Sequence, residues 1–128
     1  MRLIDSSSIV KFVCHENDWE AVDPYIDGAM TLNMSLVELA SALRKKIASN
    51  LMEVKRAMEL MEEYSLVADV IDQSRYLGRA IEISALHGTS IYDSIFIAAA
   101  IEIGCDLVSS DEKQLKIAEK LGIRTIKC

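Results

Sequence analysis

The chain has 128 residues, of which 51% are hydrophobic, and a formal net charge of −6. This length suits one domain and leaves little room for two, and the apolar content is too high for a disordered segment. An acidic chain is a poor electrostatic match for nucleic acid, unless bound divalent cations reverse the sign of its binding site.

Membrane, export and disulfide signals are missing from the sequence. No apolar run approaches the roughly 18 residues of a membrane span, and Asp5 interrupts the N-terminal segment before a signal-peptide apolar region could form. Cys14, Cys105 and Cys128 lie far apart and form no CxxC pair, which argues against zinc and against a disulfide framework. We therefore expect a cytoplasmic protein with no membrane attachment.

Short strand-like runs alternate with helical patterns along the chain. Brief apolar runs predict strands, and apolar residues spaced three and four apart predict helices. In chain order we expect a strand at 2–5, a helix at 7–17, a strand at 29–33, helices at 35–49 and 51–65, a strand at 66–71, helices at 75–88 and 91–104, a strand at 105–110, a helix at 111–122 and a strand at 123–127. The helix at 91–104 is apolar nearly all round, so it should be buried.

This alternation predicts an α/β fold with a central, mainly parallel sheet of four to five strands and helices on both faces. Right-handed crossovers place every strand-to-helix junction at the same edge of such a sheet. Open α/β sheets bind their ligands outside the carboxyl ends of the strands. Functional residues are therefore expected at the junctions.

Four acids lie at these predicted junctions. Asp5 ends the first strand, Glu38 and Asp93 lie in the first turns of their helices, and Asp111 opens the helix after the fourth strand. The strands before Asp5 and Asp111 should be near the centre of the sheet. Asp93 begins a buried helix, where an acid is costly unless it is paired. We expect the four carboxylates to meet at one edge of the sheet.

Helix capping is the alternative explanation for each acid taken singly. Acids in the first turn offset the helix dipole and accept hydrogen bonds from free N–H groups. The segments SLVE (35–38) and SIYD (90–93) both match the capping box, and Asp111 could itself be an N-cap. The sequence leaves this alternative open.

A divalent cation would explain the cluster as a whole. Neighbouring carboxylates repel one another, and some would take up protons if no cation were bound. Oxygen ligands without His or Cys favour Mg²⁺ or Mn²⁺ over zinc. Such a cation can activate water for attack on a phosphodiester.

These segments together resemble the PIN-domain family, specifically the small VapC-like toxins of prokaryotic toxin–antitoxin systems. The resemblance runs nearly end to end and is carried by LIDSSSIV (3–10), SLVELASAL (35–43), YDSIFIAAAIEIGCDLVSSD (92–111) and GIRTI (122–126). It implies a single PIN domain over 1–128, folded as a three-layer α/β/α sandwich.

By this resemblance, four acids would bind the metal and act in catalysis: Asp5, Glu38, Asp93 and Asp111. Ser109 stands where the family often has Thr or Ser two residues before the last acid, and Ser6 or Ser7 stands where a hydroxyl follows the first acid. These hydroxyls could bind phosphate or metal-bound water, or simply cap helices. The chain departs from the family at Ser110, where relatives often carry a basic or amide side chain. This change would weaken phosphate contact without removing a metal ligand.

The resemblance implies a metal-dependent endoribonuclease that cleaves single-stranded RNA with water activated by Mg²⁺ or Mn²⁺. It also implies a homodimer and, for toxin members, a cognate antitoxin. Arg44 and Lys45, about two turns beyond Glu38, are candidates for guiding RNA. The alternative for this basic stretch is a solvated helix end that complements the helix dipole.

Other functions remain as alternatives. A PIN-like protein could bind RNA or a partner without cutting, although the presence of all four acids argues against this. A phosphoacceptor receiver domain would need paired acids after the first strand, where Asp5 is followed by SSS. A haloacid-dehalogenase-type phosphatase would need an acid at the position of Ser7.

Overall fold

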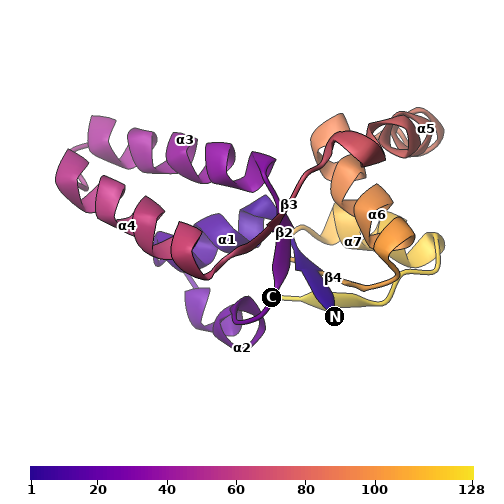
Figure 1. Cartoon of the computed structure of the whole chain (residues 1–128), viewed down its shortest axis with the longest axis horizontal. Helices are drawn as coiled ribbons and strands as arrows, with labels where there is room; N and C mark the ends of the chain where they lie inside the picture. The colour runs from indigo at the N-terminus through magenta and orange to yellow at the C-terminus, as the bar shows by residue number, and fades with distance from the viewer.

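Five parallel strands form the central sheet of the computed structural model, which describes residues 1–128 (Figure 1). Along the sheet they follow the order β3-β2-β1-β4-β5, and every neighbouring pair is parallel. The strands are β1 (Arg2–Ile4), β2 (Met30–Leu32), β3 (Asp69–Ile71), β4 (Asp106–Ser109) and β5 (Thr125–Lys127). The predicted parallel α/β sheet is confirmed.

Helices cover both faces of this sheet, which makes the fold the expected three-layer α/β/α sandwich. One face carries α1 (Ser6–Val13), α2 (Asp23–Ile26), α3 (Met34–Ala48) and α4 (Val54–Val67). The other carries α5 (Leu77–His87), α6 (Ile91–Ile103) and α7 (Glu112–Lys120). Short 3₁₀ turns at Trp19–Ala21 and Ser74–Tyr76 precede α2 and α5. In Figure 1 the α3–α4 pair lies to the left of the sheet, and α5, α6 and α7 lie to its right.

Alternating side chains of the strands contribute to two separate cores, because successive residues of a strand point to opposite faces. Leu3 and Leu107 pack in the core under α5, α6 and α7, whereas Ile4 and Val108 pack under α1, α3 and α4. Helix α6 is buried along the whole run 94–100. This burial confirms the prediction made from its apolar sequence.

Several local predictions differ from the structure. The helix predicted at 7–17 ends at Val13, and the helix predicted at 51–65 begins at Val54. The predicted strand 66–71 is wrong in its first half, because α4 continues to Val67 and β3 begins at Asp69. Leu66 and Val67 are apolar yet largely exposed, so hydrophobicity alone did not distinguish a helix end from a strand. Helix α2 was not predicted, since four residues are too few for a helical period, although Pro24 at its first turn is typical of a helix start.

The topology brings two strand ends together at the point where the chain changes direction. From β1 the chain moves outward to β2 and β3, and then returns through α5 and α6 to β4 on the other side of β1. Ile4 pairs with Val108, and the Asp5 N–H donates to the Val108 carbonyl at 3.1 Å. Asp5 and Asp111 therefore follow adjacent strands at the switch point, where open α/β sheets bind ligands. None of the helices combines the length and the apolar character needed to span a bilayer.

Candidate active site

The four predicted acids line one hollow at the carboxyl edge of the sheet: Asp5, Glu38, Asp93 and Asp111. The hollow has a volume of about 290 Å³. Its walls come from the segments that follow β1 and β4 and from the N-terminal parts of α1, α3, α6 and α7. Glu38 is the fifth residue of α3 and lies just beyond the first turn in which it was predicted. Acids from distant parts of the chain thus line one hollow, and their role in metal binding and catalysis stays a prediction.

Asp5 is held rigidly at the floor of this hollow. Its side chain is 4% exposed, and its Oδ1 accepts a hydrogen bond from the Ser8 N–H at 3.0 Å, which caps α1. Its Oδ2 accepts from the hydroxyls of Ser7 and Ser109, each at 2.8 Å. Burial raises the pKa of Asp5 above its ordinary value, and these hydrogen bonds oppose the rise.

The Ser109 hydroxyl links Asp5 to Gln114. Its Oγ lies 2.8 Å from Asp5 Oδ2 and 2.8 Å from Gln114 Oε1, and it accepts from the Asp111 N–H at 2.9 Å. Gln114 Nε2 donates to the Asp93 carbonyl at 3.1 Å, which fixes the orientation of the amide. A hydroxyl has one hydrogen and can donate to only one of two acceptors. The Ser109 hydrogen therefore serves either Asp5 or Gln114 at one time, and when it is donated to Asp5 it opposes the effect of burial on the pKa of that carboxyl.

The charge of Asp111 acts on Asp93 across the hollow. Burial raises the pKa of Asp93, and the negative charge of Asp111 raises it further. Asp111 caps α7, because its Oδ1 accepts from the N–H groups of Lys113 at 3.0 Å and Gln114 at 3.3 Å. Its Oδ2 accepts no hydrogen bond from the protein, so capping leaves one carboxylate oxygen available.

Glu38 does not belong to a capping box. Helix α3 begins at Met34, one residue before the predicted cap, and Asn33 makes no side-chain cap. Ser35 is fully buried, and its hydroxyl pairs with Thr31 Oγ1 at 2.7 Å. The capping alternative is therefore wrong for Glu38. At 90–93, by contrast, Ser90 does cap α6 by accepting from the Asp93 N–H at 3.1 Å.

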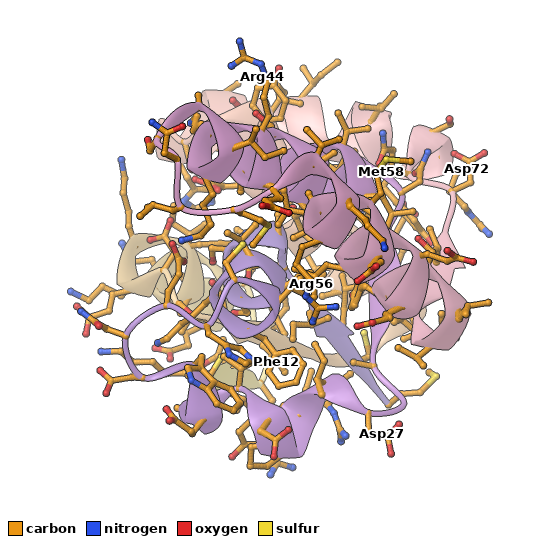
Figure 2. The ribbon with its side chains drawn as sticks, turned by 90° about the vertical axis from the view of Figure 1, so that its left-hand side faces the viewer. Phe12, Asp27, Arg44, Arg56, Met58 and Asp72 are labelled. Atoms are coloured by element: carbon orange, nitrogen blue, oxygen red, sulfur yellow. The ribbon has the colours of Figure 1, made fainter.

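The predicted substrate-binding residues fall into two groups. Ser6 and Ser7 line the acidic hollow, and Ser109 lies directly beneath Asp5. Lys45 lines a second hollow next to the first. Arg44 lies on the other face of α3, in a shallow apolar depression against α4, and Figure 2 shows it directed away from the body of the protein. The predicted role of Arg44 finds no support in this position.

Three further residues of the hollow carry polar groups and were not predicted: Glu16, Tyr92 and Gln114. Gln114 could have been found, since it follows Asp111 by three residues and shares its side of the first turn of α7. Tyr92 directly precedes Asp93. Glu16 lies beyond the end of α1, where no periodic pattern indicates its direction.

A larger cavity of about 430 Å³ lies between α1, α2 and α4. Phe12, Asp27 and Arg56 are among the residues that line it, as Figure 2 shows. Arg56 is engaged there by Glu59 and Glu63. None of the predicted site residues reaches this cavity, and its lining offers no group of acids. We therefore place the candidate active site at the acidic hollow.

The donors in the acidic hollow fit a hard divalent cation by their chemistry. They are carboxylate, hydroxyl and amide groups, with no His or Cys in the lining, and Mg²⁺ and Mn²⁺ prefer such oxygen ligands. No three of the acids lie close enough to form a ready-made metal site. Carboxylates repel one another, which keeps them apart when no cation is bound. Coordination of a cation would therefore require side chains to rotate. Asp111 Oδ2 and the Glu38 carboxylate are free to do so, because neither accepts a hydrogen bond from the protein.

Comparisons with known proteins agree with this architecture. The family model described as PIN domain matches residues 2–120. Ribonuclease VapC3 from Pyrobaculum aerophilum is 26% identical over 124 residues, which cover 92% of this chain and 92% of that protein.

Three solved structures share the fold. PAE2754 from Pyrobaculum aerophilum superposes with a TM-score of 0.76 at 18% identity, over 97% of this chain and 82% of that one. A toxin–antitoxin complex from Klebsiella pneumoniae superposes with a TM-score of 0.65 at 14% identity, over 90% of both chains. FitAcB from Neisseria gonorrhoeae superposes with a TM-score of 0.69 at 13% identity, over 99% of this chain and 97% of that one.

Proposed function

Because the chain belongs to the PIN-domain family, we propose that it forms a single PIN domain that cleaves single-stranded RNA with the help of Mg²⁺ or Mn²⁺. The observation that carries this proposal is the hollow where four carboxylates from separate segments meet at the switch point of the sheet. The similarity to Ribonuclease VapC3 supports RNA as the substrate.

Asp5, Glu38, Asp93 and Asp111 would hold the cation. When bound, the cation supplies an activated water for attack on the phosphodiester and neutralises charge on the leaving oxygen. Asp5 provides the fixed ligand, because two hydroxyls and an N–H group already orient its carboxylate. The products of attack by water are a 5′-phosphate and a 3′-hydroxyl.

The hydroxyls and caps around the hollow prepare these acids for ligation. Ser7 and Ser109 stabilise the ionised form of Asp5 against the cost of burial. The N-termini of α1, α6 and α7 carry partial positive charge, which favours ionised carboxylates beside them. Ser6 and Ser7 line the same hollow and are the proposed contacts to the phosphate.

We also propose a cytoplasmic location, a homodimer and a protein antitoxin as partner. The solved toxin–antitoxin complex with the same fold supports the antitoxin.

The alternative function is RNA or partner binding without cleavage. The presence and convergence of all four acids favour cleavage, since binding alone gives no reason to gather carboxylates that repel phosphate. Retained RNA binding with no cleavage in any divalent metal would favour the alternative.

The test is an assay of purified protein on end-labelled single-stranded RNA with Mg²⁺, Mn²⁺ or chelator. We expect cleavage that needs metal and is lost in Asp93→Asn. Asp106→Asn is the matched control, because Asp106 begins β4 at the opposite end of the strand and makes only a solvent-exposed pair with Arg124. Equal cleavage by wild type and Asp93→Asn, or a 2′,3′-cyclic phosphate product, would refute the proposed mechanism.

A further inference from the structure

A second hollow continues from the acidic hollow along the side of α3. Its volume is about 460 Å³. The two hollows share Val10, Glu16 and Glu38, so they form one groove. The far part of this groove is lined by Ser41, Ala42, Lys45 and Lys46. The lining thus changes from acidic to basic along α3.

The periodicity of α3 explains which basic residues line the groove. Ser41 and Lys45 follow Glu38 by three and seven residues, so the three side chains share one face of the helix. Arg44 falls on the other face, beside Met58 of α4. In Figure 2 the Arg44 side chain extends outward from the edge of α3.

The two lysines are available to an anion. Neither forms an ion pair, whereas Arg56, Arg79, Arg124 and Lys127 do. Lys46 also acts on α1: burial raises the pKa of the Cys14 thiol, and the charge of Lys46 opposes that rise. Lys46 therefore acts electrostatically on the end of α1 while it lines the groove from α3.

We propose that this groove binds the RNA strand next to the cleavage point, with Lys45 and Lys46 holding backbone phosphates. This inference rests on the proposed function. Lys45 lies about 10 Å further along α3 than Glu38, at 1.5 Å per residue. Successive nucleotides of a stacked strand are about 3.4 Å apart. The lysines therefore contact the RNA backbone about three nucleotides from the scissile phosphate. In a more extended strand this separation corresponds to fewer nucleotides.

The test compares single-charge variants on the two faces of α3. Binding of a fluorescein-labelled single-stranded RNA is measured by anisotropy in an Asp93→Asn background, over a range of salt concentrations. Lys45→Gln should lower the slope of log K against log salt by about 0.7, which is about a fourfold loss of affinity near 0.15 M salt. Arg44→Gln removes the same charge from the adjacent residue and should bind as tightly as the parent protein.

The length of the RNA gives a second readout. RNAs shortened one nucleotide at a time from either end should lose the effect of Lys45→Gln once fewer than about three nucleotides remain on one side of the cut. Equal losses in Lys45→Gln and Arg44→Gln, or no length dependence, would overturn the groove assignment.

The two proposals can fail separately. Wild type that binds RNA with the Lys45 effect but never cuts would refute the nuclease and support the groove. Metal-dependent cutting with no difference between Lys45→Gln and Arg44→Gln would support the nuclease and refute the groove. Absence of RNA binding under all conditions would refute both.

Discussion

Ser109 is expected to be a major determinant of both stability and metal affinity, although it is no acid. It is fully buried at the end of β4 and joins Asp5, Gln114 and the Asp111 N–H through one hydroxyl. Ser109→Ala leaves two groups without this partner: the Asp111 N–H, and the one acceptor to which the hydroxyl donates, Asp5 Oδ2 or Gln114 Oε1. The substitution thus removes a link between two strand ends and α7.

The size of the effect follows from these two unpaired groups. Each buried polar group left without a partner costs about 1–3 kcal/mol. The Asp111 N–H is only partly buried, so we expect a loss of about 2–4 kcal/mol in the free energy of unfolding. With a typical urea m-value of about 2 kcal/mol/M, the midpoint would fall by about 1–2 M.

Urea denaturation followed by circular dichroism measures this loss. Ser110→Ala is the matched control, since its hydroxyl contacts only Ser8 Oγ at 3.2 Å and Cys128 Sγ at 3.9 Å. It should cost less than about 1 kcal/mol. Loss of the Ser109 hydrogen bond also raises the pKa of Asp5 further, so protons should compete more strongly with the cation below neutral pH. Equal midpoints for the two alanine variants would refute this account of the network.

Three further outcomes follow from the site. Burial raises the pKa of Asp5 in the folded protein above 3.8. Protonation of Asp5 therefore stabilises the folded state, and this stabilisation is lost as pH rises from 3.8 through the raised pKa. Asp5→Asn removes this pH-dependent contribution, so the unfolding free energy of the variant should rise relative to that of the wild type as pH increases. Mn²⁺ at tenfold its dissociation constant should stabilise wild type by about 1.4 kcal/mol in thermal melts; this gain should vanish in Asp93→Asn and persist in Asp106→Asn. Gln114→Leu removes the amide's contacts with the Asp93 carbonyl and the Ser109 hydroxyl and should cost about 1–3 kcal/mol of unfolding free energy, measured by urea denaturation.

The fold was predictable because strand and helix periods differ and because α6 is apolar all round. The errors lie where the physical signal is weak. Leu66 and Val67 end α4 in solvent, where neither burial nor a capping glycine marks the boundary with β3. Helix α2 consists of four residues and depends on its packing under α1 more than on its own sequence.

The site was predictable only as far as topology determines it. Strand ends meet at a switch point, so Asp5 and Asp111 could be placed together from the order of elements alone. Glu38 required the true start of α3, since a shift of one residue decides whether it caps the helix. Gln114 and Glu16 were missed because an amide near a helix start and an acid in a loop are common on protein surfaces.

Capping and metal binding were hard to separate because both require the same residue at the same place. Helix N-termini gather at the switch point, and an acid there satisfies N–H groups whether or not it also binds a cation. Asp5 and Asp111 show that the two roles are compatible, because each caps its helix through Oδ1 alone.

The negative charge of the chain determines how RNA must approach this site. At an effective dielectric constant of 20, two unit charges 4 Å apart interact by about 4 kcal/mol, so a phosphate entering the bare hollow would be repelled by several carboxylates. The lysines at the far end of the groove attract the strand but cannot offset that repulsion at the hollow itself. A divalent cation reverses the local sign. The affinity of the wild-type protein for an RNA analogue that cannot be cut should therefore rise when Mg²⁺ is added, and this rise should be larger for RNA that spans the cut than for RNA that fills only the basic part of the groove.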